Sequence, residues 1–169
     1  MDYKDGLLSL QEKVEDELEK YIRQIAIKVS DDATDIIIQN KAIGYQRQLY
    51  RNIRYNVYKE AASIIGIVGV GSNVHYGIFR HEGTRPHFPP IEPIQKWVIY
   101  KGLVRDRNNK PSSIRAIKND KPKFDESRSI AFLIARKIAK KGTKGLPFLK
   151  LALDQNREFI QRKLNEIKI

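Results

Sequence analysis

Imidazole and carboxylate side chains gather between residues 75 and 87, where His75, His81, Glu82 and His87 lie close together in the chain. Histidine nitrogens and carboxylate oxygens are common zinc ligands, so this density first suggests a metal site. The spacing matches no known ligand motif, and the side chains of the adjacent His81 and Glu82 would point apart in any regular element. We therefore expect surface or turn roles for these residues, and neither a metal nor another cofactor.

Hydroxyl and acidic side chains form no catalytic pattern elsewhere in the chain. No hydroxyl lies in a G-x-S-x-G elbow, and the acid pairs at 31–32 and 125–126 fall at expected helix starts, where capping explains them. The chain has no cysteine, which excludes thiolate nucleophiles, disulfides and cysteine metal sites. We expect the protein not to be an enzyme. The hydroxyls considered are Ser63, Ser72, Thr84 and Thr143.

Length and composition are those of one folded domain over residues 1–169. Apolar residues make up 41% of the chain and charged residues 31%, which is too apolar for a disordered chain. No window approaches the roughly 18 to 20 uncharged apolar residues that span a bilayer, and acids stand where a signal peptide would be basic. We expect no membrane partner, and synthesis in the host cytoplasm.

The formal net charge of +12 is unevenly distributed along the chain. Residues 1 to 50 carry seven basic and ten acidic side chains, whereas residues 101 to 150 carry fifteen basic and four acidic ones. A concentrated positive region favours an acidic partner, such as nucleic acid, an anionic surface or an acidic protein ring. A solvated lysine-rich loop and helix face would account for the same residues, so charge alone leaves both interpretations open.

An amphipathic helix is predicted within the N-terminal segment 1–41. Its apolar residues recur every three or four positions and form one stripe, which continues through Ala33, Ile36 and Ile37. We expect this long helix either to break near Ser30-Asp31-Asp32 or to project toward a neighbouring subunit. The stripe begins with Leu7, Leu10, Val14, Leu18, Tyr21, Ile25 and Val29.

A β-hairpin is predicted next. Ile53, Tyr55 and Val57 alternate with polar residues, the two-residue period of a strand with one buried face. SIIGIVGVG, residues 63 to 71, supplies an antiparallel partner. Its G-x-x-G-x-G spacing is reversed from the dinucleotide fingerprint and lacks a P-loop lysine, so we expect bulges or close backbone packing at the glycines instead of a phosphate site.

A proline-rich loop follows the hairpin and leads to a short helix. Pro86, Pro89 and Pro90 stop any regular element and stiffen the chain. Ile91 to Gly102 then has helical spacing. Residues 103–124 form a basic loop without clear structure, the expected mobile arm. Its patch residues are Arg105, Arg107, Lys110, Arg115, Lys118, Lys121 and Lys123.

Two further helices complete the chain. Asp125 is the expected cap of a helix that ends at Gly142, and Pro147 starts a last helix that runs through Ile167. The order of elements predicts an α+β fold, in which a small antiparallel sheet packs with a long N-terminal helix and two or three C-terminal helices.

The segment YGIFRHEGTRPHFPP resembles the signature of the bacteriophage tail-component family, whose members are described as tail-completion or head-to-tail joining proteins, minor tail protein Z-like. In that family a short helical turn ends in an acid-Gly-Thr box, matched here by Glu82, Gly83 and Thr84, after an aromatic and a small residue, here Tyr76 and Gly77. GYQRQLYRNIRY, IEPIQKWVIYKGL and GTKGLPFLKLALDQN resemble three further family segments in the same order. The resemblance covers roughly residues 44 to 160.

This resemblance implies a structural virion protein at the neck, where head and tail join. It implies a closed ring of copies, sixfold, that meets the head connector and the tail tube or tail terminator proteins, with genomic DNA as a further contact in the lumen. We hypothesise that the acidic N-terminal helix and the basic 101–150 region are complementary patches, so that reversing Lys118, Lys121 and Lys123 would block attachment.

The acid-Gly-Thr box would act as a stiff docking loop. Gly83 permits a positive φ, and Thr84 can hydrogen-bond a neighbouring backbone group. A loop that is rigid before assembly loses less entropy on docking. Phe88 would supply apolar contact area, whereas Trp97 is expected to close the protein's own core. The expected docking residues are Tyr76, Glu82, Gly83, Thr84, Pro86, His87, Phe88, Pro89 and Pro90.

A module that binds nucleic acid through the 101–150 region is the alternative function. Phosphate contacts release counterions, so this alternative predicts binding that weakens steeply with salt. Only Tyr100 and Phe124, at the edges of the basic stretch, could stack on bases. A small hydrolase that uses the histidines is a third alternative, and it would lose activity in His81→Ala.

Overall fold

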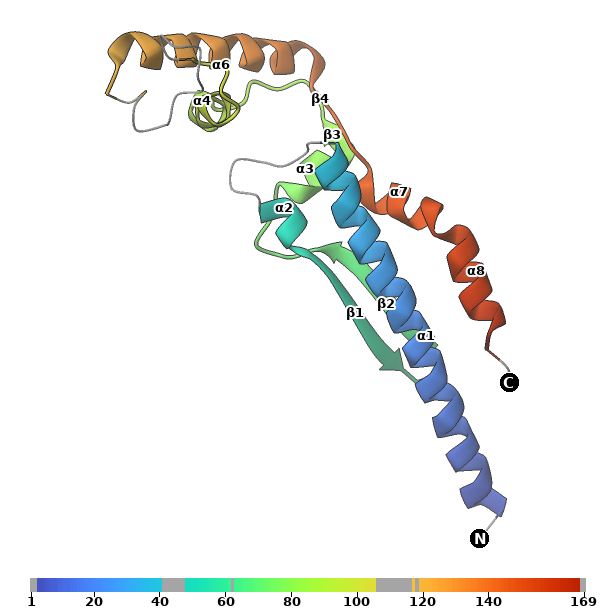
Figure 1. Cartoon of the computed structure of the whole chain (residues 1–169). Coiled ribbons are helices and arrows are strands. Elements are labelled where there is room, and N and C mark those ends of the chain that lie inside the picture. The colour runs from blue at the N-terminus through green and yellow to red at the C-terminus, as the bar shows by residue number, and fades with distance from the viewer. Residues whose placement is uncertain (1–2, 41–47, 62, 106–116, 118, 168–169) are drawn as a thin grey trace. The chain divides into compact units, whose positions relative to one another are not determined.

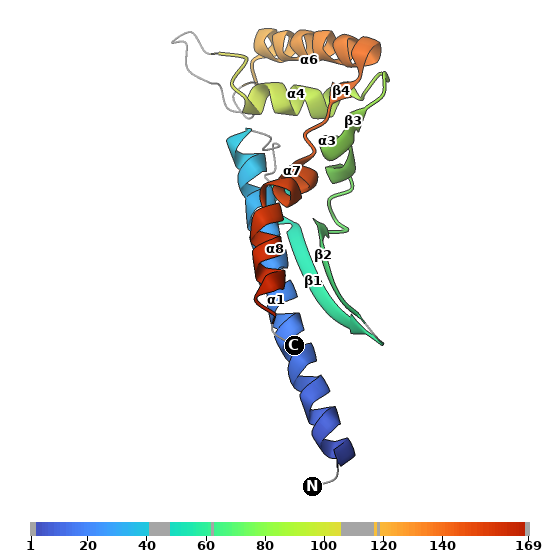
Figure 2. The same ribbon diagram turned by 90° about the vertical axis from the view of Figure 1, so that its right-hand side faces the viewer.

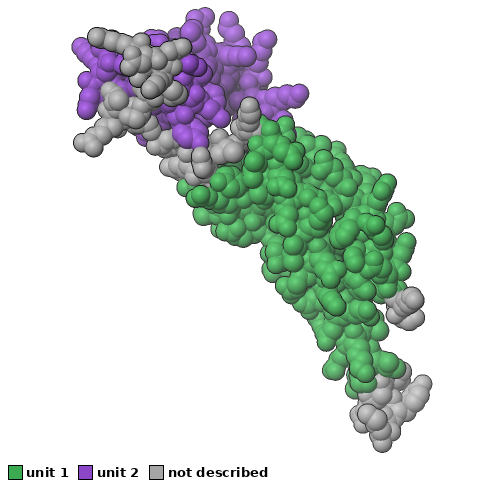
Figure 3. Space-filling model, viewed as in Figure 1, with its two compact units in different colours: residues 1–43, 48–77, 147–169 green, residues 44–47, 78–146 purple. Residues whose placement is uncertain are grey.

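The computed structural model describes residues 3–40, 48–61, 63–105, 117 and 119–167. Contacts divide the chain into two compact units, shown in Figure 3 and described separately below. The first comprises residues 1–43, 48–77 and 147–169, and the second comprises 44–47 and 78–146. The predicted α+β class is confirmed, whereas the single tail-completion domain stays a prediction. No helix in the described ranges is long and apolar enough to cross a membrane.

One uninterrupted helix, α1 (Tyr3–Gln39), organises the first unit. The predicted stripe is confirmed in its second half, where Val29, Ala33 and Ile37 are buried. The alternative of a break at Ser30-Asp31-Asp32 is wrong, and so is the interpretation of residues 31–32 as a helix start. The apolar period continues through these residues, and Asp32 forms an ion pair with Lys28 one turn earlier, at 2.6 Å.

The predicted hairpin packs on α1. Strands β1 (Ile53–Glu60) and β2 (Ser63–Val70) pair antiparallel in continuous register, from Ile53 opposite Val70 to Glu60 opposite Ser63. The sequence predicted either bulges or close backbone packing at the glycines of β2. Close packing is confirmed at Gly66, where a β-carbon would lie 2.9 Å from Ile22 Cγ2 on α1. The predicted buried face is only partial, because Tyr55 remains 41% exposed.

The predicted last helix is two helices, α7 (Phe148–Gln155) and α8 (Arg157–Asn165), which run along α1 in Figures 1 and 2. They meet at Asn156, which is buried and donates side-chain hydrogen bonds to Ala152 O at 2.8 Å and to Asp32 Oδ2 at 2.6 Å. A side chain that bonds backbone and a neighbouring helix interrupts a helix readily. A short helix, α2 (Gln48–Arg51), adds the buried Leu49 to this unit.

In the second unit, α4 (Ile91–Tyr100) lies against α6 (Lys121–Lys141), as Figures 1 and 2 show. Between them Gln95 Nε2 donates to Ser127 Oγ at 2.7 Å. The prediction that Trp97 closes the core is wrong, because its side chain is 36% exposed and its neighbours are buried instead. The buried core residues are Val98, Ile99, Val104, Ile117 and Ala131.

The ends of α6 test two predictions. The helix starts four residues before the predicted cap, since Asp120 occupies the cap position and accepts from the Lys123 N–H at 3.3 Å. Asp125 therefore lies inside the helix, and the predicted basic loop 103–124 ends at 120. The predicted stop at Gly142 is confirmed, and its φ of 67° is the left-handed conformation that favours glycine.

Candidate functional site

Two Gly-Thr dipeptides far apart in the sequence pair with each other in the second unit. The first forms β3 (Gly83–Thr84) after α3 (Gly77–Glu82), and the second contributes Thr143 to β4 (Thr143–Lys144) after α6. Thr84 lies opposite Thr143 in this antiparallel ribbon. Their hydroxyl oxygens are 3.0 Å apart, and the Thr143 N–H donates to Thr84 Oγ1 at 3.2 Å.

Glycines allow the two strands of this ribbon to approach each other closely. Gly83 and Gly142 have φ angles of 87° and 67°. A β-carbon would collide with the Thr143 carbonyl if added at Gly83, and with the Thr84 carbonyl if added at Gly142. The predicted positive φ at Gly83 is confirmed. Thr84 also bonds a backbone N–H, as predicted, but the donor is the distant Thr143 and not a residue next to it in the sequence. The ribbon thus has little conformational freedom.

The proline-rich exit from the ribbon is held at both ends. His87 Nδ1 lies 2.9 Å from the Arg85 carbonyl oxygen, and Pro90 precedes the first residue of α4. Between them the Phe88 ring packs against Phe132 of α6, with ring centroids 6.0 Å apart. The loop is therefore tied to α6 by an aromatic contact as well as stiffened by its prolines.

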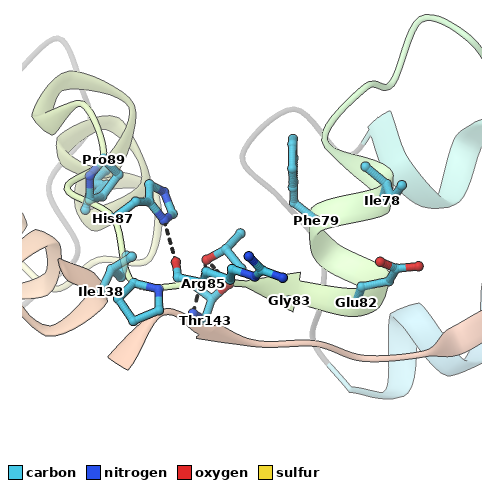
Figure 4. A pocket seen from close by; sticks show the side chains of 12 residues that line it. Ile78, Phe79, Glu82, Gly83, Arg85, His87, Pro89, Ile138 and Thr143 are labelled. Atoms are coloured by element: carbon cyan, nitrogen blue, oxygen red, sulfur yellow. Dashed lines mark hydrogen bonds between the residues drawn. The ribbon is translucent and has the colours of Figure 1, made fainter. Parts of the chain in front are cut away.

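A pocket of about 960 Å³ opens beside the ribbon. Figure 4 shows Ile78 and Phe79 of α3 at one side, His87 and Pro89 at the other, and Arg85 between them. All its lining residues belong to the second unit. They are Ile78, Phe79, Glu82, Gly83, Thr84, Arg85, Pro86, His87, Pro89, Ile94, Ile138 and Thr143.

The lining of this pocket combines exposed apolar side chains with a carboxylate and a guanidinium. Ile78 and Phe79 each leave 58% of their surface exposed, which is unusual for two adjacent large apolar residues. The Thr84 hydroxyl is engaged with Thr143, and the nearby charges are the carboxylate of Glu82 and the guanidinium of Arg85. Within the described ranges, no three His, Asp or Glu side chains are grouped so that they could hold a metal. Such a pocket suits an apolar side chain flanked by polar or charged groups.

Six of the nine predicted docking residues line this pocket. Phe88 lies outside the pocket and packs against Phe132 of α6, and Pro90 directly precedes α4. Tyr76 lies in the first unit, where partial burial raises the pKa of its phenol more than a hydrogen bond with the Leu49 backbone lowers it. Arg85, Thr143 and the exposed pair on α3 were missed. A signal for Thr143 was present, because a second Gly-Thr after a helix repeats the first. The six are Glu82, Gly83, Thr84, Pro86, His87 and Pro89.

The predicted basic patch is only partly described. Arg107, Lys110, Arg115 and Lys118 lie outside the described residues. Lys121 and Lys123 belong to the first turn of α6, where Lys123 Nζ is 3.1 Å from Asp120 Oδ2. Arg105 is exposed and follows the buried Val104. The basic patch therefore stays a prediction.

A denser cationic group lies at the other end of α6 and was not singled out from the sequence. Arg136, Lys137, Lys140 and Lys141 are all exposed on its last turns and line one shallow hollow together with Leu133. Positive charge at a helix C-terminus is favoured by the helix dipole. The group is therefore stable where it is, and available to a partner.

Comparison of this chain with known protein families, with curated proteins and with solved structures finds no match. The resemblance to the tail-component family therefore depends on the four sequence segments, and the function that it implies is a proposal.

Proposed function

We propose that this protein is a structural subunit of a long-tailed bacteriophage that joins the tail to the head at the neck. It acts by docking and by ring assembly with copies of itself, between the head connector and the tail tube or terminator proteins. The observation that carries the proposal is the exposed apolar pair Ile78–Phe79, beside a pocket whose polar hydroxyls are already paired.

The ribbon supports this role because it is rigid before any partner arrives. Gly83 and Gly142 are fixed in conformations that other residues rarely adopt, and the paired threonine hydroxyls hold the two strands. Docking on such a surface orders few groups, so more of the contact free energy appears as affinity. Large exposed apolar side chains on a rigid frame are the anchors that commonly dominate protein interfaces.

The function is tested by disrupting the reading frame in a phage that carries it and imaging the particles. The expected result is DNA-filled heads and finished tails that are not joined. Purified wild-type protein added to that lysate should restore joined particles and plaque formation. Intact infectious virions without the protein would overturn the proposal, and so would particles arrested before the heads are filled.

A further inference from the structure

The outer face of α6 combines exposed apolar and cationic side chains. Phe132 is 47% exposed and Leu133 is 62% exposed. Leu133 lies on the side of the helix opposite the buried Ala131 and Ala135, and Phe132 lies at the edge of that side, where its ring also contacts Phe88. Apolar side chains of this size usually face the core in a helix that packs on another. Their exposure on a single helix indicates a surface that is covered in an assembly.

Two shallow hollows meet on this face at Leu133. One, of about 450 Å³, includes Phe132 together with Arg128 and Asp125, and the other, of about 250 Å³, includes Arg136 and Lys140. If an apolar side chain of a partner helix enters the first hollow, the partner's side chain one helical turn further along lies next to the cations of the second hollow. The face therefore fits an amphipathic helix that has an apolar residue and an acid at this spacing.

The charge of this face limits which kind of partner can bind to it. The second hollow is lined by four basic side chains and by no acidic one, whereas the first contains one basic and one acidic side chain. The occupant should therefore be acidic as well as apolar. Duplex DNA would match the cations but would leave the apolar hollow around Leu133 unfilled, so an acidic helix fits better.

The N-terminal turns of α1 have this chemistry. Leu8 and Leu10 are each 59% exposed, and Glu12 and Glu17 are exposed further along the helix. Leu8 and Glu12 are one turn apart on the same side of the helix, as are Leu133 and Lys137 on α6.

These turns also belong to the end of α1 that extends beyond the hairpin. Figures 1 and 2 show α1 continuing past the tip of the hairpin, where Lys59 pairs with Asp16 at 3.0 Å and Gln11 lines a hollow with Lys59 and Glu60. Helical turns without tertiary packing are marginally stable in water, so a projecting amphipathic end gains from a partner.

We propose that the N-terminal turns of α1 in one copy dock on the outer face of α6 in a second copy. Leu8 enters the hollow beside Phe132 and Leu133, and Glu12 faces Arg136 and Lys140. The contact is heterologous, since different surfaces meet, so it repeats from copy to copy, and it forms a ring where the rotation between copies returns to the first copy. It deepens the proposed function, on which the assignment of a ring rests.

The test uses the full chain and two complementary variants. One carries Leu8→Ser and Glu12→Lys, and the other carries Leu133→Ser and Arg136→Glu. By sedimentation velocity the wild type should self-associate, whereas each variant alone should associate at least tenfold more weakly. An equimolar mixture should form a dimer of one copy of each variant and nothing larger, because one intact donor end and one intact acceptor face remain. Circular dichroism checks that both variants fold.

A matched control makes the same kinds of change away from both faces. Leu153→Ser with Glu158→Lys alters an exposed leucine and an exposed acid of α7 and α8, and should associate like the wild type. A wild type that stays monomeric at all concentrations, or a mixture that forms no dimer, would overturn the proposal. So would a monomeric wild type that binds duplex DNA and loses this binding on Leu133→Ser with Arg136→Glu. Self-association of purified protein is measured independently of head and tail joining, so failure of one proposal is distinguishable from failure of the other.

Discussion

The side-chain amide of Asn156 donates a hydrogen bond to Asp32 Oδ2 at 2.6 Å, between two residues that are 124 positions apart. Asn156 is buried where α7 gives way to α8, and Asp32 lies in the middle of α1. The Lys28 ammonium bonds the same carboxylate at 2.6 Å. One acid of α1 thus fixes the position of the C-terminal helices in the first unit.

Replacing Asn156 with alanine should destabilise the first unit by about 1–3 kcal/mol, because a buried hydrogen bond to a charged acceptor is lost. Urea unfolding followed by far-UV circular dichroism measures this change. Gln155→Ala alters the exposed neighbouring residue and should stay within about 0.5 kcal/mol of the wild type. Equal effects of the two substitutions would show that the Asp32 bond contributes nothing.

The same carboxylate predicts a dependence of stability on pH. Partial burial raises the pKa of Asp32, but hydrogen bonds from Lys28 and Asn156 lower it more, so the net pKa lies below its ordinary value of 3.8. A depressed pKa in the folded state contributes stability above pH 3.8, which is lost as the pH falls through the folded pKa. Asp32→Asn should therefore destabilise the protein near pH 6 and by less near pH 2.5, measured by unfolding at both values.

The longer helices α1, α4 and α6 could be predicted from the sequence because each carries an apolar period. Apolar residues recur through α1 without interruption, and that period outweighed the local capping signal of Asp31 and Asp32. The start of α6 was predicted at the wrong residue. Asp120 and Asp125 are both good cap residues, and only the packed structure distinguishes them.

The site was predictable only in part. Glycine and proline chemistry identified the stiff turn at Gly83 and its exit, because both are local properties. The pairing of Thr84 with Thr143 is a contact over 59 positions, and no local period encodes it. Exposure of Ile78 and Phe79 likewise depends on what the rest of the unit leaves uncovered.

Gly142→Ala should destabilise the second unit by about 1–3 kcal/mol or more, because the residue has a positive φ and a β-carbon would meet the Thr84 carbonyl. Fluorescence of Trp97, the single tryptophan, reports unfolding of this unit. Gly69→Ala is the control, since nothing lies within 4 Å of a β-carbon built there; it lies in the first unit, so its unfolding is followed by far-UV circular dichroism, and its stability should change little. If both glycines tolerate alanine equally, the ribbon is less constrained than the structure indicates.

The threonine pair should behave as a coupled unit. Thr84→Val and Thr143→Val each remove one hydroxyl of nearly the same shape, and each should cost about 0.5–1.5 kcal/mol. The double variant should cost less than the sum, because the hydroxyls of Thr84 and Thr143 bond each other. A double-mutant cycle with Trp97 fluorescence measures the coupling energy. Strict additivity would mean that each hydroxyl bonds water or another group instead.

Phe79→Ser should reduce head and tail joining at least tenfold while leaving the fold intact. The Phe79 ring is already 58% exposed, so its loss removes little buried area from the unit but takes an anchor from the docking surface. A tenfold effect corresponds to about 1.4 kcal/mol of contact free energy. The measurement is restoration of plaques when purified variant is added to a lysate that lacks the protein. Leu153→Ser, which alters a residue 50% exposed on α7, should restore plaques as well as the wild type. If Phe79→Ser restores them equally well, the pocket is not the surface that docks.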